Sequence, residues 1–387
     1  MILRELNLLN FKNIEQASLH FADRLNCLIG LNGQGKTNVL DAIYMLSFTK
    51  SAFAQQDNLS IRHGETTAMV QGLYEKDDEV LRISCGLKQG GKKVFRRGDK
   101  AYSRLSDHIG LLPLVLISPQ DLDLVLGGSE VRRRFLDGTL SQYDPAYLPT
   151  LNAYSQLLMQ RNALLKQLAD NDHADLSVLS VYDEQMAPLA EQIYAVRRQC
   201  VELFVPYFTD TYAILSDEQE QVSLTYNSQL AQRQVPDVWS MTRERDRILG
   251  WTSVGVHKDD LQLTMNGYPL RQVASQGQMK TCLLALRLAQ ALFLTGQTRH
   301  APLLLLDDLF DRLDSQRVTR FLQFVVRDTL FLPSLQTTIE QPFAQIFLTD
   351  TDLNHLARLL DTAPDPSLHE QVRFFEVSEG RITQRQS

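Results

Sequence analysis

A glycine-rich segment at residues 30–37 carries the clearest chemistry in the sequence. It reads Gly30-Leu31-Asn32-Gly33-Gln34-Gly35-Lys36-Thr37, followed by Asn38, and fits the pattern G-x-x-x-x-G-K-[ST]. Glycines let backbone N–H groups turn toward phosphate oxygens, the lysine reaches the β- and γ-phosphates, and the threonine hydroxyl ligates Mg²⁺. We predict that residues 30–38 bind a nucleoside triphosphate, with Lys36 also acting in catalysis and Thr37 holding Mg²⁺. The alternative is a chance glycine turn.

Two adjacent aspartates supply a second candidate for phosphate chemistry. Asp307 and Asp308 directly follow the apolar run 303–306. A buried strand that ends in a carboxylate is typical of the Walker B segment, which lies beside the phosphate-binding loop. We predict that Asp307 holds Mg²⁺ and that Asp308 is the general base for the attacking water. The alternative is a strand that ends in an ordinary acidic turn.

A short polar segment, Ser275-Gln276-Gly277-Gln278, precedes an apolar helix and lies 32 residues before Asp307. By itself it reads as a helix N-cap. Its position is that of the signature loop of ABC-type ATPases, whose serine, glycine and helix N-terminus bind the γ-phosphate held by a second subunit. One copy cannot present both faces to one nucleotide. We therefore predict a head-to-tail homodimer on ATP binding, with Ser275, Gly277 and Gln278 contacting the partner's ATP and Ser275 assisting catalysis.

The spacing of apolar residues indicates the elements that must position these segments. A strand at 25–29 leads into a helix from about residue 35, a meander of short strands spans 66–117, helical periodicity begins at 144, and strand signals return after 250. The continuous apolar runs at 303–306 and 346–348 favour a covered parallel sheet. We predict an α/β fold: an ABC-type P-loop ATPase lobe with a β-subdomain (1–140 and 251–387), interrupted by an α-helical second lobe (141–250) with no long coiled-coil arm.

The charge balance restricts how this chain could hold a polyanion. Its 387 residues include 39 Lys and Arg against 46 Asp and Glu, a net charge of −7, so DNA would be held by local basic patches or by a nucleotide-bound dimer. Two clusters are candidates for sequence-independent phosphate contacts: Lys92, Lys93, Arg96 and Arg97, and Arg132, Arg133 and Arg134. The alternatives are a solvated face for the first cluster and internal packing for the second.

The cysteines and the apolar runs give two further expectations. The four cysteines, Cys27, Cys85, Cys200 and Cys282, show no CxxC spacing, which indicates buried reduced thiols rather than a disulfide framework or a zinc site. No apolar run approaches the roughly 18 residues of a membrane span. We expect a cytoplasmic protein with no membrane partner.

Taken together, these segments resemble the RecF family of bacterial recombination-repair ATPases, which are related to the SMC and Rad50 proteins. The resemblance covers nearly the whole chain, and the stretches that carry it are 11–13, 30–37, 118–122, 132–137, 160–166, 255–261 and 275–278. Three positions depart from the family pattern: Lys12 replaces the usual Arg, Gln120 a frequent Glu, and Val256 the usual Pro. None of them removes a phosphate or metal ligand.

The resemblance implies further site residues. Lys12 would bind the nucleotide. Gln120 would be the Q-loop residue that senses Mg²⁺ and acts in catalysis; the alternative is a polar residue that merely follows a strand. Leu313-Asp314 would form a D-loop that reaches across the dimer. Many ABC ATPases carry a switch histidine where this chain has Thr349-Asp350-Thr351, so either threonine would sense the γ-phosphate.

The same resemblance implies a function. ATP would close two subunits into a clamp on double-stranded or gapped DNA, and slow, DNA-stimulated hydrolysis would reopen it. The family role is to help load the RecA recombinase onto single-stranded DNA together with RecR and RecO. Two alternatives are the ATP-binding subunit of a transporter and a P-loop enzyme with a fused nuclease.

Overall fold

The computed structural model describes residues 1–169, 175–216, 220–231, 235–298, 300–309, 315–351 and 371–385. The chain forms two compact units. Unit 1 comprises Met1–Leu122, Tyr207–Gln219 and Ser275–Ser387, and unit 2 comprises Asp123–Pro206 and Glu220–Ala274. Unit 2 begins earlier and ends later than the helical lobe predicted at 141–250, because α3 (Ser129–Tyr143) packs on α4 (Tyr147–Leu168) and on β10 (Asp260–Met265). Residues 207–219 belong instead to unit 1.

A mostly parallel sheet in unit 1 brings the chemical segments to one edge. Its strand order is β17-β16-β3-β15-β12-β8, with bounds Arg381–Gln384, Val372–Ser378, Leu25–Ile29, Gln345–Asp350, Leu303–Leu306 and Leu114–Ile117. Strands β3, β15, β12 and β8 are buried along their whole length, as expected for a sheet covered on both faces. Since neighbouring parallel strands end at the same edge, the segments after β3, β12 and β15 meet there.

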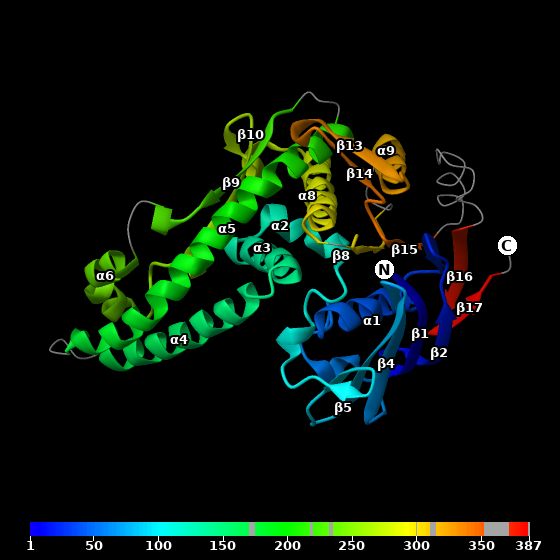
Figure 1. The fold of residues 1–387 in the computed structure, drawn as a ribbon, viewed down its shortest axis with the longest axis horizontal. Helices are drawn as coiled ribbons and strands as arrows, with labels where there is room; N and C mark the ends of the chain where they lie inside the picture. The colour runs from blue at the N-terminus through cyan, green and yellow to red at the C-terminus, as the bar shows by residue number, and fades with distance from the viewer. Residues whose placement is uncertain are drawn as a thin grey trace. The chain divides into compact units, whose positions relative to one another are not determined.

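A second sheet of unit 1 is antiparallel. Its order is β2-β1-β4-β5-β6-β7, with bounds Ile14–His20, Ile2–Phe11, Thr67–Lys76, Glu79–Lys88, Val94–Arg97 and Lys100–Ala101. This sheet holds most of the meander predicted at 66–117 together with β1 and β2, whereas β8 belongs to the parallel sheet. Helix α1 (Lys36–Phe48) contacts strands of both sheets, and one hydrophobic core joins them. Figure 1 places α1 beside β1 and β4, and the C-terminal hairpin β16–β17 beside β2.

Helix α8 (Gln276–Gln297) packs on β8 and on β14 (Thr337–Glu340), the partner of β13 (Thr329–Leu332). Among the helices described, α8 is long and apolar enough to cross a membrane, but 72% of its most apolar window is buried inside the protein. The sequence analysis predicted an apolar helix here, but its apolar run falls short of a membrane span because charged Lys280 and Arg287 interrupt it. We interpret α8 as a core helix of unit 1. All four cysteines are buried and free.

Unit 2 is mainly helical. It contains α2 (Asp123–Leu126), α3, α4, most of α5 (Ser180–Leu215), α6 (Val235–Leu249) and α7 (Leu270–Val273), with the sheet β11-β10-β9 (Tyr268–Pro269, Asp260–Met265 and Val222–Asn227). Helix α5 has 36 residues and continues through Pro188 and Pro206, so at 1.5 Å per residue it is about 54 Å long.

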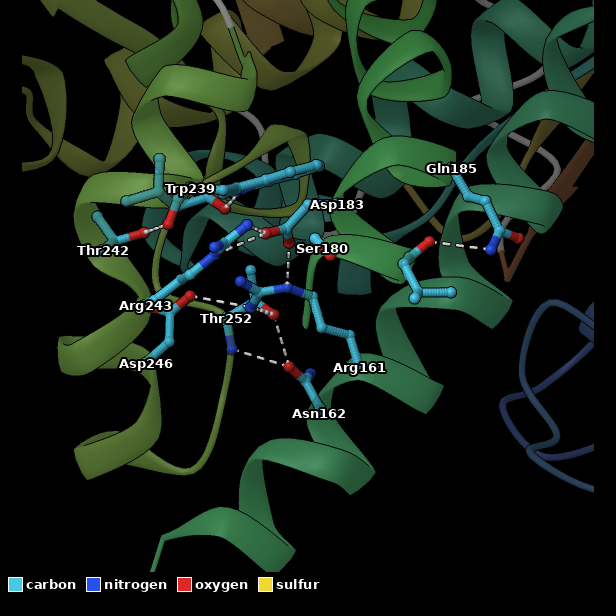
Figure 2. Close-up of polar contacts among 12 residues, drawn as sticks. Arg161, Asn162, Ser180, Asp183, Gln185, Trp239, Thr242, Arg243, Asp246 and Thr252 are labelled. Atoms are coloured by element: carbon cyan, nitrogen blue, oxygen red, sulfur yellow. Dashed lines mark hydrogen bonds and ion pairs between the residues drawn. The ribbon is translucent and has the colours of Figure 1, made fainter. Parts of the chain in front are cut away.

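A buried ion-pair cluster joins α4, α5 and α6 (Figure 2). Arg161 is fully buried, and its guanidinium donates to Asp183 at 2.9 Å, to Asp246 at 2.9 Å and to the Thr252 hydroxyl at 2.7 Å. Arg243 adds a second guanidinium on Asp183, so two cations face two carboxylates. This arrangement gives a structural reason for the Arg161 stretch that carried part of the family resemblance.

Candidate functional site

The glycine-rich loop connects β3 to α1 and has the backbone conformation that its glycines permit. Gly33 and Gly35 have φ values of +80° and +117°, in the region that side chains disfavour. A Cβ on Gly30 would lie 2.2 Å from the Val377 carbonyl oxygen, and one on Gly35 would lie 2.8 Å from the Asn13 side chain. The fold itself therefore requires glycine at these positions.

Lys36 lies at the start of α1, and its ammonium is directed back at the loop. The Nζ atom donates to the carbonyl oxygens of Gly30 at 2.7 Å and Leu31 at 3.2 Å. It is 3.7 Å from a carboxylate oxygen of Asp308. The ammonium is therefore enclosed, with its nearest contacts made to neutral carbonyl groups.

The Thr37 hydroxyl and the Asp307 carboxylate meet at the edge of the sheet. Thr37 Oγ1 donates to Asp307 Oδ1 at 2.8 Å, and the same oxygen lies 3.0 Å from the hydroxyl of Thr349. Burial raises the pKa of Asp307 and the neighbouring Asp308 charge adds to this, while the hydrogen bonds from Thr37 and Thr349 oppose it. A hydroxyl beside a desolvated carboxylate is an oxygen donor set that fits Mg²⁺.

Asp308 is more accessible than Asp307. Its side chain is 27% exposed, and its backbone has φ of +42°, which is unusual for a residue with a side chain. It borders a pocket with an apolar lining, formed by Ser118, Pro119, Leu122, Lys280, Leu283, Leu284 and Leu309. The carboxylate therefore stands at an opening beside the buried Asp307.

The segment predicted as a signature loop starts helix α8. Ser275 is the N-cap: its hydroxyl accepts from the Gln278 N–H at 3.2 Å, and the Gln278 side chain accepts from the Ser275 N–H at 2.5 Å. The N-cap alternative is thus confirmed, and a role in phosphate binding stays a prediction. A Cβ on Gly277 would lie 1.8 Å from Nη1 of Arg317, on α9 (Ser315–Val325), so the glycine also makes room for a guanidinium.

Two residues expected at the site are placed differently. Lys12 Nζ pairs with Asp41 of α1 at 2.6 Å, so its charge is already matched. Gln120 is exposed on the 3₁₀ turn Pro119–Leu122, and no contact among the described residues links its side chain to Thr37 or Asp307. Their roles at the nucleotide stay predictions. Leu313 and Asp314 lie outside the described residues.

Two hairpins support the loop in ways that the sequence did not indicate. Asn13, in the turn between β1 and β2, donates to the Gln34 carbonyl at 2.9 Å and accepts from Asn38 at 2.7 Å. In the β16–β17 turn, Glu379 N–H donates to the Gln34 side chain at 2.6 Å, and Gly380 N–H to its carbonyl at 2.9 Å. Asn13 stood in a stretch that carried the resemblance, whereas the second turn gave no signal.

The first basic cluster lies on unit 1. Lys92, Arg96 and Arg97 are exposed, while Lys93 pairs with Asp57 at 3.1 Å. Arg96 and Arg97 are consecutive in β6, so their side chains point to opposite faces of the sheet. One DNA surface therefore cannot contact all four residues in the same way.

The second basic cluster lies on α3 of unit 2. Arg132 forms a two-pronged ion pair with Asp260 at 2.7 and 2.9 Å, and Arg133 donates to the Asp259 carbonyl at 2.6 Å. Arg134 is exposed and pairs with Glu130, four residues earlier. These contacts favour internal packing for Arg132 and Arg133. DNA contact by the cluster stays a prediction.

The parallel sheet, the glycine-rich loop and the paired aspartates define an ABC-type ATPase. Residues 2–345 match the family model described as the RecF/RecN/SMC N terminal domain. A protein of Phocaeicola vulgatus named "DNA replication and repair protein RecF" is 43% identical, with 100% of this chain and 99% of the relative covered. The chain belongs to the RecF family.

Solved structures give the same assignment. The recombination mediator protein RecF with ATP, of the RecFOR pathway, has a TM-score of 0.84 and 26% identity over 100% of this chain and 98% of that one. An Smc head bound to the C-terminal winged-helix domain of ScpA has a TM-score of 0.57 and 15% identity over 100% of this chain and 98% of that chain. The second comparison supports the fold alone.

Proposed function

We propose that this protein is an ATP-dependent DNA-binding ATPase of recombinational repair and replication restart. The observation that carries the proposal is the convergence of five groups from three distant segments. Lys36 and Thr37 lie beside Asp307 and Asp308, and Asp307 accepts hydrogen bonds from Thr37 at 2.8 Å and from Thr349 at 3.0 Å. Family membership, and the name and ATP of the relatives described above, support the same reading.

Four residues of this chain would have different roles in ATP binding and hydrolysis. Lys36 would exchange its carbonyl contacts for β- and γ-phosphate oxygens, because a charged acceptor binds an ammonium more strongly than a neutral one. Thr37 and Asp307 would hold Mg²⁺, which neutralises phosphate charge when bound. Asp308, at the opening, would orient the attacking water and accept its proton. Gln120 would join this group only after moving from its exposed position.

A second copy would complete each site. Ser275, Gly277 and Gln278 at the start of α8 would bind the γ-phosphate of the ATP held by the partner's loop, where the helix N-terminus favours negative charge. Two ATP molecules would then lie between two head-to-tail subunits. Slow, DNA-stimulated hydrolysis would separate them.

The DNA would be double-stranded or gapped. A single copy has a net charge of −7, which disfavours binding of a polyanion. Closure of the dimer would bring the basic residues of two copies into one channel. The family role supports further partners: RecR, with RecO and RecA, at single-stranded DNA in the cytoplasm. The transporter and nuclease alternatives find no support in the family to which the chain belongs.

The decisive experiment measures molar mass by light scattering with and without ATP, and with and without a gapped duplex. We expect the wild-type chain to double its mass only with ATP. Lys36→Ala should abolish both ATP binding and the mass change, because it removes the main side-chain cation from the phosphates.

Lys50→Ala is the matched control, since Lys50 is exposed beyond the other end of α1. It should dimerise as the wild-type chain does. Unchanged ATP affinity and dimer mass in Lys36→Ala would refute the proposed nucleotide site. A wild-type molar mass that does not change when ATP is added would refute the ATP-dependent clamp.

A further inference from the structure

Thr349 occupies a central position between the two aspartates. It is the penultimate residue of β15 and is 1% exposed. Its hydroxyl accepts from the backbone N–H of Asp308 at 2.9 Å, and it lies 3.0 Å from Asp307 Oδ1 and 3.2 Å from Asp308 Oδ1. One side chain thus contacts the backbone and the carboxylate of Asp308 together with the carboxylate of Asp307.

The contact falls where the sheet ladder stops. Strands β12 and β15 pair up to Leu306 and Leu348, and beyond that point the chain turns through Asp308 at φ of +42°. A left-handed conformation at a non-glycine residue persists only where its surroundings hold it. The Thr349 hydroxyl supplies that support, because it takes the Asp308 N–H that the ladder no longer pairs.

The proton of the Thr349 hydroxyl already has acceptors in this structure. A threonine hydroxyl has one proton to donate, and both carboxylate oxygens within reach of it belong to the two aspartates. Direct contact with a γ-phosphate oxygen would require the proton to leave them. The geometry therefore favours a role on Asp308 over direct sensing of the phosphate.

We propose that Thr349 is a positioning residue that sets the backbone and carboxylate of Asp308 for hydrolysis. The inference rests on the proposed ATPase function. It assigns to this threonine the orientation of the carboxylate that receives the water proton. Asp307 keeps its shorter hydrogen bond from Thr37 when the Thr349 hydroxyl is removed, so ATP affinity and closure of the dimer should not depend on Thr349.

Two substitutions separate the hydroxyl from the packing around it. Thr349→Val keeps the shape and removes the hydroxyl, and Thr349→Ser keeps the hydroxyl. We expect Val to slow single-turnover hydrolysis by about 10–100-fold, the loss that misplacing a reacting group causes. The KM for ATP and the ATP-dependent dimer should be unchanged, and Ser should restore most of the rate.

The matched control is Thr211→Val, a threonine in unit 1 that is also fully buried and lies on α5. It should hydrolyse ATP at the wild-type rate. Hydrogen exchange of the peptide 303–309 in the chain without nucleotide gives a readout that is independent of activity. The Asp308 amide should lose protection in Thr349→Val and keep it in Thr349→Ser.

Three results would overturn the proposal: wild-type hydrolysis by Thr349→Val, no rescue by Ser, or a loss of ATP binding and dimerisation together with hydrolysis, which would make Thr349 a nucleotide contact. Failure of the proposed function is distinguishable, because the wild-type chain itself would then neither bind ATP nor dimerise. The exchange measurement would still decide whether Thr349 holds the Asp308 backbone.

Discussion

Unit 1 and unit 2 each contain a buried cluster of basic residues and aspartates, and the two clusters differ in how their charges are matched. In unit 2, Arg161 is 0% exposed and donates to two carboxylates and a hydroxyl at 2.7–2.9 Å. In unit 1, Lys36 is nearly as buried, but its close contacts are carbonyl oxygens, and its carboxylate neighbour is 3.7 Å away and 27% exposed.

The difference separates a scaffold from a site. A cluster that binds a ligand must exchange contacts, and neutral carbonyl groups release an ammonium more readily than carboxylates do. The unit 1 cluster also stands on backbone with positive φ at Gly35 and Asp308, whereas Arg161, Asp183 and Asp246 lie on helices. We expect substitutions in unit 1 to change catalysis and those in unit 2 to change stability.

The largest expected effect is on turnover in unit 1. Asp308→Asn keeps the shape of the side chain but cannot accept a proton, so hydrolysis should slow by about 10²–10⁴-fold. ATP affinity should be almost unchanged, and the variant should accumulate as an ATP-bound dimer on duplex or gapped DNA. Single-turnover hydrolysis and DNA dissociation, measured side by side, test this.

Asp307→Asn is the comparison for that variant. It removes a charge from the expected Mg²⁺ ligand, so it should impair dimer closure as well as hydrolysis. A wild-type hydrolysis rate in Asp308→Asn would falsify its role as the base. Rapid DNA release by that variant despite stalled hydrolysis would instead contradict the coupling of hydrolysis to release.

The next effect is on the stability of unit 2. Arg161→Met leaves Asp183 paired with Arg243 but takes the Arg161 cation away from the buried Asp246, and breaking such a pair costs about 3–5 kcal/mol. Both tryptophans of the chain, Trp239 and Trp251, lie in unit 2, so their fluorescence in a denaturant titration follows its unfolding. Nucleotide affinity, measured below the transition, should be unchanged.

Lys166→Met also replaces a cationic side chain of α4 by methionine, but at an exposed position. It should leave the unfolding midpoint nearly unaltered. Equal midpoints for the Arg161 and Lys166 variants would show that the cluster contributes little to folding. Loss of ATP binding in a folded Arg161 variant would make the cluster part of the site and end the contrast between the two units.

The sequence predicted one of these clusters and not the other, for a physical reason. The glycine-rich loop is a contiguous pattern, and the parallel strands that were recognised from their apolar runs bring Asp307 to it. Arg161 finds its partners 22 and 85 residues away on helices whose relative packing no local pattern specifies. The Asn266-Gly267 turn between β10 and β11 shows the opposite case, because a local pattern does specify it: both residues adopt positive φ within a two-residue hairpin.

Basic runs were the least predictable feature. Arg132, Arg133 and Arg134 are identical in sequence, yet two of them are used in internal contacts and the third is exposed. Whether each arginine is buried or exposed depends on which side of α3 faces β10. A run of three identical residues does not indicate which side that is. The sequence likewise does not indicate which face of the sheet Arg96 and Arg97 point to. The smallest expected effect is that of these residues on DNA binding.

Arg96→Ala should weaken DNA binding by the ATP-bound dimer only a few-fold, because each phosphate contact contributes about 0.9 to the slope of log affinity against log salt for duplex DNA. Arg97→Ala should have less effect, since Arg97 points to the face that carries buried Phe95 and Arg96 to the other.

Arg134→Ala is the counterpart in unit 2. Its ion pair with Glu130 is 71% exposed on both sides, so its loss costs a few tenths of a kcal/mol or less. Fluorescence anisotropy at several salt concentrations gives the three slopes. A slope reduced only by Arg134→Ala would place the DNA path on unit 2, because this guanidinium is the exposed member of its cluster. Three unchanged slopes would exclude Arg96, Arg97 and Arg134 from the DNA surface.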